Sequence, residues 1–453
     1  MKTWLWIAIP VFALAAFAAE SLKETYDADA EKIIDAALAG NESYARLAYL
    51  CDRIGNRLSG SQSLNRAIEW AAAGMKQDGL QNVHTQPVKV PHWVRGRESA
   101  GIVAPVEKAL NILGVGGSVA TPKTGITAEV VVVTSFDELE KQGRAGVEGK
   151  IVLFNAPYEG YMRTVQYRGS GASRAAKLGA VAVLVRSVTP VSLQSPHTGA
   201  LEYASTVPKI PAASVTIEDA ELLQRLSGAG GPVKVHLEME AHTLPDADSA
   251  NVIGEIVGRE KPEEIVLIGG HIDSWDVGQG AQDDGSGIVT AMEAARLLVK
   301  LDLRPRRTLR VVCWTNEENG GAGAKAYRES VGGKIKTHVA AIEMDGGAEK
   351  PVGFGYSGLR EPASIARLKE IAELLRSIQA DSAQSGGGGA DIAPLMRDGV
   401  PGLSLRTVGT HYFDWHHTNS DTVDKIRPEE LRLNVAVMAV LSYVLADMPE
   451  TLK

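Results

Sequence analysis

The order of apolar and polar residues predicts alternating strands and helices through the second half of the chain. Short apolar runs that are typical of buried strands occur at 251–257, 265–270, 309–315, 339–344 and 400–405. Predicted helices separate them, at 286–300, 323–331, 361–378, 390–397 and 428–448. Strands that alternate with helices favour an α/β fold with a mostly parallel mixed sheet and helices on both faces.

The first half of the chain has a different pattern. Helices are predicted at 22–38, 43–53 and 63–78, followed by strands at 83–90, 99–103 and 109–113. Stretches rich in Gly, Pro, Ser, Thr or Asp at 114–125 and 243–249 indicate boundaries. Between them lie predicted strands at 129–133, 150–154, 180–185 and 233–237 and a helix at 171–178. We therefore predict a smaller α/β domain at 120–242, inserted into a larger domain formed by 19–119 and 243–453.

The N-terminus has the pattern of a secretory signal peptide. Lys2 precedes an apolar run from 4 to 17, and Ala16-Phe17-Ala18 offers a cleavage site with small residues at its ends. The run is too short for a comfortable membrane span. We predict a signal peptide at 1–18, a mature chain that is secreted or periplasmic, and no stable membrane insertion after cleavage.

Composition and charge narrow the classes of protein that fit. The 453 residues exceed one ordinary core, which supports two or three domains. A formal net charge of −8 argues against a nucleic-acid partner. Export permits disulfides, but only Cys51 and Cys313 are present, and both lie inside apolar patterns. We favour two buried free thiols.

Residues that can bind a ligand follow four of the predicted strands. They are His271 and Asp273 after 265–270, Glu317 and Glu318 after 309–315, Asp345 after 339–344, and His416 and His417 after 400–405. Such residues gather at the carboxyl ends of parallel strands. Asp283 lies near the start of the helix that follows His271. Taken alone, 271–287 could be a polar surface loop with Ser286 as a helix N-cap, but four coinciding strand ends favour a ligand site.

The residue types at these strand ends favour a metal site. Histidine nitrogen and carboxylate oxygen without thiolate suit zinc and, less well, cobalt or manganese. Two histidines and at least three carboxylates exceed the needs of one tetrahedral ion, so two ions that share a carboxylate fit better. Of the adjacent Glu317 and Glu318, one could bind metal while the other acts as a general base toward water.

Several segments resemble a known family. The segments in the second half are His271-Ile-Asp-Ser-Trp-Asp, Gln282-Asp-Asp-Gly-Ser-Gly, Asn316-Glu-Glu-Asn-Gly-Gly, Glu343-Met-Asp-Gly-Gly and His417-Thr-Asn-Ser-Asp-Thr. Their order and spacing resemble the co-catalytic zinc exopeptidases, which include aminopeptidase Y-type enzymes and glutamate carboxypeptidases. Segments at 195–199, 207–211 and 398–402 resemble the carboxypeptidase Q branch of that family. The resemblance implies a zinc exopeptidase (phosphorylase/hydrolase-like) fold with an inserted protease-associated domain.

The resemblance also implies a role for each residue at the strand ends. Glu317 resembles the general base, and Asp273 resembles the carboxylate that orients metal-bound groups. The spacing His-x-x-x-Asp-Thr favours His417 over His416 as a ligand. The implied ligands of two Zn²⁺ ions are Asp283 shared between both, His271 and Asp345 on one ion, and Glu318 and His417 on the other.

The function implied is that of an exported di-zinc metalloexopeptidase acting on short peptides, in particular unblocked dipeptides. A zinc-bridging hydroxide would attack the peptide with Glu317 as the base. Alternatives are an aminopeptidase of the same fold acting on longer peptides, a single-zinc glutaminyl cyclase, and a non-catalytic binding protein. The full two-ion ligand set argues against the last two. Enzymes of this branch form dimers, so the resemblance also implies a homodimer.

Some weaker candidates remain open. Tyr412 and His411 could contact substrate or pack on the domain. The glycine run at 385–389 is interpreted as a flexible active-site loop. Asp391 could serve as a helix cap or could orient a metal ligand.

Overall fold

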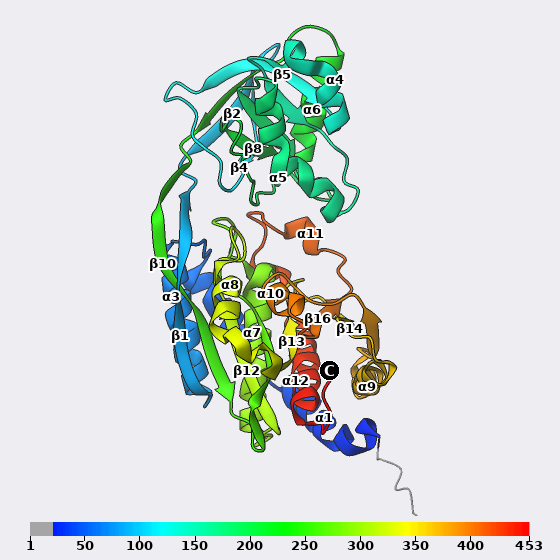
Figure 1. The fold of residues 1–453 in the computed structure, drawn as a ribbon. Helices are drawn as coiled ribbons and strands as arrows, with labels where there is room; N and C mark the ends of the chain where they lie inside the picture. The colour runs from blue at the N-terminus through cyan, green and yellow to red at the C-terminus, as the bar shows by residue number, and fades with distance from the viewer. Residues whose placement is uncertain (1–20, 453) are drawn as a thin grey trace, which may run out of the picture.

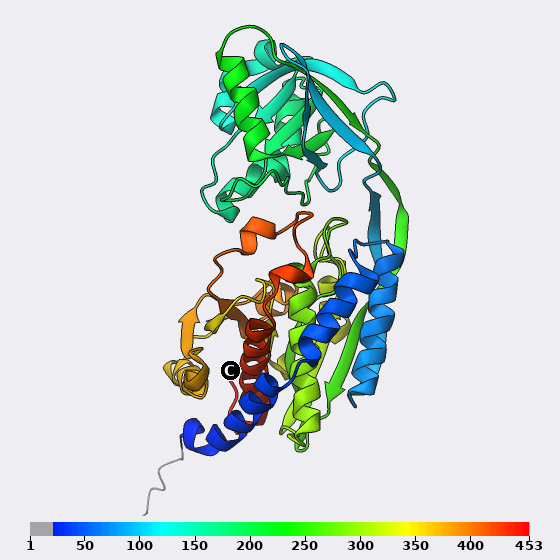
Figure 2. The same cartoon turned by 180° about the vertical axis from the view of Figure 1, so that it is seen from behind.

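The computed structural model describes residues 21–452, so the predicted signal peptide at 1–18 lies outside the described residues. Figures 1 and 2 show two lobes joined by a long ribbon of two strands, β1 (Gln81–Val94) and β10 (His242–Ile256). The lower lobe holds both ends of the described chain. Within 21–452, no helix has the length and apolar character that a membrane crossing requires.

The lower lobe is built on an eight-stranded mixed sheet. Besides β1 and β10, its strands are β11 (Lys261–His271), β12 (Arg307–Trp314), β13 (His338–Glu343), β14 (Pro351–Ser357), β15 (Ser382–Ser385) and β16 (Gly402–Thr407). The order is β1-β10-β12-β11-β13-β16-β14-β15. The central strands β12, β11, β13 and β16 run parallel, whereas β1, β10 and β14 pair antiparallel with neighbours. This is the mostly parallel sheet that the sequence predicts.

Helices cover both faces of this sheet because alternate strand residues enter different cores. Val266 and Ile268 of β11 join a large core on one face, and Ile265 and Leu267 join a smaller core on the other. The helices of the large core are α1 (Leu22–Ala39), α2 (Glu42–Tyr49), α3 (Gln62–Gln77), α7 (Ser286–Lys300), α9 (Pro362–Glu373) and α12 (Pro428–Asp447). The smaller core is covered by α8 (Ala322–Val331) and α10 (Ala393–Arg397). Short turns complete the lobe: α11 (Tyr412–Trp415), η1 (Leu50–Ile54), η2 (Ala281–Gly285), η3 (Gly332–Thr337), η4 (Arg376–Ile378) and η5 (Val423–Lys425).

The upper lobe is built on a second eight-stranded mixed sheet. Its strands are β2 (Glu98–Ala104), β3 (Lys108–Leu110), β4 (Ile112–Gly114), β5 (Ile126–Val133), β6 (Ile151–Phe154), β7 (Ala182–Arg186), β8 (Ala212–Val215) and β9 (Lys234–Met239). The order is β3-β2-β9-β5-β6-β7-β8-β4. One face packs against α6 (Ile217–Gly228), and the other packs against α4 (Phe136–Val147) and α5 (Tyr161–Lys177). This sheet already includes residues from Glu98, whereas we predicted an inserted domain from 120; the limits of that domain stay a prediction.

Most predicted helices and strands form near their expected bounds, but three differences matter. Residues 243–249, which we interpreted as a domain boundary, are a strand: they belong to β10 and continue the ribbon with β1. Pro245 is tolerated there because this part of β10 pairs only with β1, on one side. The helix predicted at 171–178 begins earlier, at Tyr161. The apolar pattern did not reveal α4, α6, β8, β14 and β15.

The side-chain contacts differ from the prediction at Ser286 and agree with it at the two cysteines. Ser286 is not the N-cap of α7, because its hydroxyl donates to the Gln282 carbonyl at 3.2 Å. Gly285 occupies the N-cap position, and the Asp284 carboxylate just before it accepts a hydrogen bond from the Gly287 amide at 2.9 Å. Cys51 and Cys313 are both buried and unpaired, in agreement with the prediction of free thiols.

Candidate metal centre

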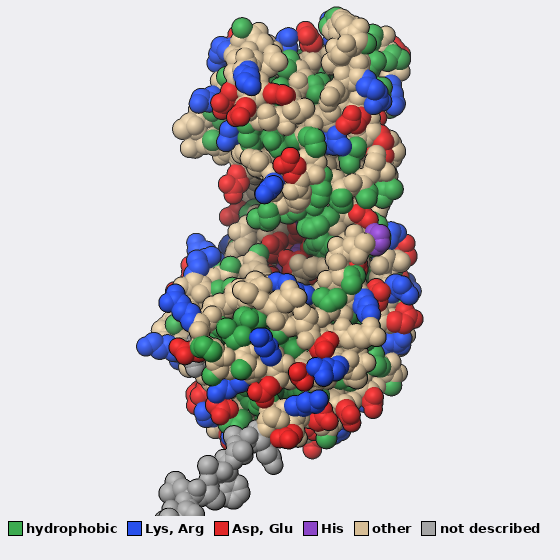
Figure 3. Space-filling view, turned by 90° about the vertical axis from the view of Figure 1, so that its right-hand side faces the viewer, with side chains coloured by type: hydrophobic (Ala, Val, Ile, Leu, Met, Phe, Trp, Pro, Cys, Tyr) green, Lys and Arg blue, Asp and Glu red, His purple; other side chains and the backbone are tan. Residues whose placement is uncertain are grey.

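The carboxyl ends of the central strands deliver the predicted residues to one place, between the two lobes. β11 ends at His271, β12 leads to Glu317 and Glu318, β13 leads to Asp345, and β16 leads through α11 to His417. Most of these side chains line a cavity of about 290 Å³. Figure 3 shows acidic side chains inside the hollow between the lobes and hydrophobic side chains around it. The complete lining is Tyr161, Arg168, Ala200, Asp283, Glu317, Glu318, Asp345, Tyr412, Phe413, His416 and His417.

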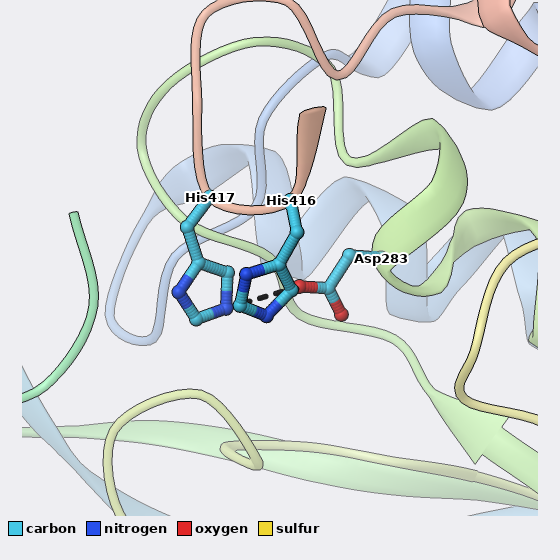
Figure 4. A group of neighbouring side chains, drawn as sticks. All are labelled: Asp283, His416 and His417. Carbon is cyan, nitrogen blue, oxygen red and sulfur yellow. Dashed lines mark ion pairs between the residues drawn. The ribbon is translucent and has the colours of Figure 1, made fainter. Parts of the chain in front are cut away.

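Asp283 lies at the centre of two clusters of potential metal ligands. Its Oδ1 is 3.1 Å from His271 Nε2, which is in turn 3.5 Å from Asp345 Oδ1. Its Oδ2 is 3.0 Å from His417 Nε2 and 3.5 Å from His416 Nε2. Figure 4 shows the Asp283 carboxylate pointing toward the two histidine rings. The ligand atoms of each cluster lie within 4.8 Å of one another, so one carboxylate can serve both clusters.

Both candidate ligand histidines have their second ring nitrogen turned toward a backbone carbonyl. His271 Nδ1 is 3.0 Å from the Asp273 carbonyl, and His417 Nδ1 is 3.3 Å from the Thr198 carbonyl. A carbonyl can only accept, so these contacts assign a proton to Nδ1 of both rings. Each Nε2 faces carboxylate oxygens, which also only accept, so a second proton or a metal ion has to lie between them. With Nδ1 protonated, Nε2 is the nitrogen that can bind a metal.

The adjacent glutamates occupy different positions in the cavity. Glu318 Oε2 is 3.0 Å from His417 Nε2, and its other oxygen accepts the Trp275 amide at 3.2 Å. Glu317 also lines the cavity, but no ion pair joins it to His271 or His417. Burial raises the pKa of Glu318 to about 7 and that of Glu317 well above its usual range, and nearby carboxylates add to both shifts. Because only Glu318 contacts a candidate ligand histidine, Glu318 is suited to metal binding and Glu317 to proton transfer.

Asp273 holds these two glutamates in place. Its carboxylate accepts the amide of Glu317 at 3.0 Å and the amide of Glu318 at 3.3 Å. The side chain is fully buried and does not line the cavity. Asp273 thus contacts the backbone of both glutamates, and its Oδ1 also lies 3.9 Å from Nδ1 of the candidate ligand His271.

The cavity fits a bound cation by its charge and by its unsatisfied oxygens. Four carboxylates face it, and buried like charges repel one another unless a cation compensates them. Asp283 Oδ2 and Asp345 Oδ1 are buried, and neither accepts a hydrogen bond of good geometry from the described residues. Nitrogen and carboxylate oxygen without thiolate are donors that zinc accepts. The described residues therefore fit the expected metal.

Two residues that the sequence analysis did not assign hold the turn around Asp283. The Asp421 carboxylate accepts the amides of Ala281 at 3.1 Å, Gln282 at 2.7 Å and Asp283 at 3.3 Å. Arg57 is fully buried, and its guanidinium donates to four backbone carbonyls within 3.0 Å, those of Gly55, Ile272, Gln279 and Gly280. Together these side chains fix both ends of the loop that joins His271 to Asp283.

Replacing Arg57 with methionine is expected to destabilise the protein by at least about 3 kcal/mol, because buried carbonyls would lose their donor. The free energy of unfolding from chemical denaturation would measure this loss. Arg53→Met is the matched control, since Arg53 is exposed in the neighbouring turn. Equal stability of the two variants would contradict the supporting role of Arg57.

The upper lobe takes part in the site. The Thr198 amide donates to the His417 carbonyl at 3.0 Å, in addition to the contact with the His417 ring. The Arg95 guanidinium pairs with Asp276 at 2.5 Å, and a Cβ on Gly116 would lie 2.0 Å from the Trp275 ring. These contacts place the upper lobe directly against the loops that carry the candidate ligands.

The weaker candidates have separate outcomes. Tyr412 is buried and lines the cavity, whereas His411 is exposed and pairs with Asp414. His416 stacks on His417 with ring centroids 3.5 Å apart and belongs to one of the two ligand clusters. Asp391 caps no helix: it lies before α10, and both its carboxylate oxygens are buried without a partner.

An α/β sheet with buried histidines and carboxylates at its carboxyl edge, and a second lobe over that edge, defines the class of metal-dependent α/β hydrolytic enzymes. Residues 251–442 match the model of peptidase family M28, and residues 126–223 match the PA domain. Carboxypeptidase Q of Mus musculus is 47% identical over 94% of this chain and 91% of its own length. Carboxypeptidase Q of Homo sapiens is 47% identical over 93% of this chain and 90% of its own length.

Two solved structures are similar to this chain. A peptidase M28 precursor from Shewanella amazonensis has a TM-score of 0.92 and 34% identity, over 95% of this chain and 99% of its own. A zinc aminopeptidase from Bacillus subtilis shares the fold, with a TM-score of 0.68 and 21% identity over 90% of this chain and 96% of its own. The chain therefore belongs to peptidase family M28, as a zinc exopeptidase of the carboxypeptidase Q type with an inserted PA domain.

Proposed function

We propose that the protein hydrolyses short peptides, in particular unblocked dipeptides, with two zinc ions that share Asp283. The observation that carries this proposal is the pair of ligand clusters around one carboxylate, with Glu317 beside them in the same cavity. His271 and Asp345 would complete one zinc site, and Glu318 and His417 would complete the other. His417 is favoured over His416 because its Nε2 is 3.0 Å from both Asp283 and Glu318.

The proposed reaction assigns a separate task to each residue. Zinc bound here would polarise the scissile carbonyl and lower the pKa of the attacking water. A carboxylate oxygen of Glu317 takes a proton from that water and later passes it to the nitrogen of the leaving amine. Asp273 keeps Glu317 in position through its backbone amide. Burial keeps competing water away from the proton that Glu317 carries.

The size of the cavity supports short substrates. A volume of about 290 Å³ lies near the lower end of the range for small-molecule sites, which is roughly 300–1,000 Å³. Aromatic side chains of both lobes border it, including Tyr161 and Phe413, whose rings stack at 4.9 Å. A long or folded substrate would have to displace this wall.

Purified protein is expected to cleave free dipeptides at least about tenfold faster than N-blocked dipeptides or longer peptides. A blocking group or an additional residue would not fit the cavity and would cost binding energy. Product analysis by chromatography, with and without a zinc chelator, would measure this preference. Faster cleavage of longer peptides would favour an aminopeptidase. Pyroglutamate formation with one zinc would favour a glutaminyl cyclase, and no turnover would favour a binding protein.

We propose that the enzyme is exported and acts outside the cytoplasm. The N-terminal pattern at 1–18 supports export, and the homodimer expected from the resemblance is proposed with it. Size measurement of the mature chain in solution would test the dimer.

A further inference from the structure

The two candidate zinc sites differ in the lobe that holds their histidine. The His271 ring has its acceptor two positions away, at the Asp273 carbonyl of the same loop. The His417 ring has its acceptor in the other lobe, at the Thr198 carbonyl, 219 positions away. The contact of the second ring nitrogen sets the orientation of a ligand histidine. The lower lobe alone therefore orients His271, whereas the inserted lobe orients His417.

The backbone of His417 also depends on the inserted lobe. Its φ of 61° lies in the left-handed region, which residues other than glycine rarely adopt. Such a conformation persists only where the surrounding structure fixes it. The amide of Thr198, which is fully buried, supplies one restraint by donating to the His417 carbonyl at 3.0 Å. Thr198 thus holds both the ring and the backbone of this candidate ligand.

Arg95 connects Thr198 to the lower lobe. It lies where the chain leaves β1 for the upper lobe, and its side chain is 10% exposed. Its Nη2 donates to the Thr198 hydroxyl at 3.3 Å, and that hydroxyl donates to the Gly114 carbonyl at 2.8 Å. Its Nε and Nη2 also donate to the two carboxylate oxygens of Asp276, at 2.9 and 2.5 Å. Such a forked pair fixes direction as well as distance.

The pair of Arg95 and Asp276 is the contact through which charge holds the lobes together. Asp276 follows His271 in the loop after β11, so it belongs to the lower lobe. Of the ion pairs formed within 21–452, this one alone joins the two lobes. Arg95 therefore links the loop of one candidate ligand to the residue that holds the other.

We propose that Arg95 positions His417 as a zinc ligand by docking Thr198 of the inserted lobe against it. Docking of this lobe and zinc binding at the His417 site are then coupled, because His417 is oriented as a ligand only when Thr198 lies beside it. Such coupling is reciprocal, so zinc at this site also favours the docked lobe. The proposal rests on the two-zinc part of the proposed function and adds the residue that assembles one of the two sites.

The His271 site is expected to be independent of Arg95. Its loop is held within the lower lobe by Arg57, which donates to the Ile272 carbonyl at 2.8 Å. Its other ligand, Asp345, follows β13 of the same lobe. Loss of Arg95 should therefore weaken the binding of one ion and spare the other.

The test measures zinc content and zinc affinity after dialysis against buffered free zinc, in wild type, Arg95→Met and Asp276→Asn. Both variants should keep the ion of the His271 site and bind the second ion at least about tenfold more weakly, the usual effect of losing a residue that orients a ligand. Excess zinc should restore hydrolysis of a free dipeptide. The control is Arg97→Met, which breaks an exposed ion pair with Glu240 and should bind zinc as wild type does.

A combined variant separates a positioning role from a general structural one. If Arg95 acts through His417, adding Arg95→Met to His417→Ala should not lower the zinc content further. Asp276→Asn keeps the test decisive if Arg95→Met does not fold. It changes a partly exposed side chain and leaves Arg95 beside Glu98, 3.8 Å away.

Three results would overturn the assignment. Equal weakening of both ions in the single variants, or a further loss in the combined variant, would show a structural role only. Two tightly bound ions in both Arg95→Met and Asp276→Asn would show that docking does not orient His417, while the proposed hydrolysis stands. A wild-type protein that binds no more than one zinc ion would reject the two-zinc proposal and the role of Arg95 together.

Discussion

Replacing Glu317 with glutamine is expected to lower the rate of peptide hydrolysis by roughly 100- to 10,000-fold, the usual contribution of a general base. Glutamine has nearly the same shape but cannot take a proton from water. The Glu317 amide, held by Asp273 at 3.0 Å, stays the same in the variant, so the loop should keep its position. Rate measurements on a free dipeptide, together with elemental analysis, would show lost turnover at unchanged zinc content.

The matched control for this variant is Glu329→Gln, on the exposed side of α8. It makes the same chemical change away from the cavity and should keep wild-type turnover. If Glu317→Gln kept near-normal turnover, Glu317 would not be the base. If it lost zinc as well, Glu317 would act as a ligand instead.

Substituting alanine for Asp283 is expected to remove both zinc ions and to lower turnover by at least about 100-fold, because the metal contributes several kcal/mol to transition-state stabilisation. Asp283 belongs to both ligand clusters, whereas Asp345 belongs to one. Asp345→Asn should therefore reduce the metal content at one site only. Elemental analysis after dialysis would separate these two results.

The control for both aspartate variants is Asp35→Ala on α1, where the side chain is exposed. It should bind as much zinc as wild type. Loss of a single ion in Asp283→Ala would contradict a shared carboxylate. Retention of both ions would remove Asp283 from the ligand set.

The sequence was sufficient to place most of the candidate centre because the site follows from sheet geometry. Parallel strands end at the same edge, so the apolar runs before His271, Glu317 and Asp345 were enough to bring those residues together. His417 is farther from its strand, and the resemblance at 417–422 was needed to choose it over His416. The structure brings both histidines within reach of Asp283.

Residues that support the site from a distance could not be found in this way. Arg57 donates to the Ile272 carbonyl, 215 positions away, and a backbone acceptor leaves no pattern in the sequence. Arg168 lies in the polar first half of α5, which the apolar pattern did not identify as helical. Its place in the cavity wall depends on how the inserted lobe packs against the lower lobe, and strand and helix patterns do not contain that information.

The ribbon of β1 and β10 has a consequence for how the two lobes could be separated by protein engineering. Val94 and His242 face each other as a pair, so the chain leaves and re-enters the lower lobe about one strand spacing apart, roughly 4.8 Å. A short hairpin turn could join them and delete the upper lobe without a gap in the remaining sheet. The product would keep Asp283 and its neighbouring ligands but lack Arg168, Tyr161 and Thr198. Such a minimal protein would separate the candidate metal centre from the lobe that forms the other wall of its cavity.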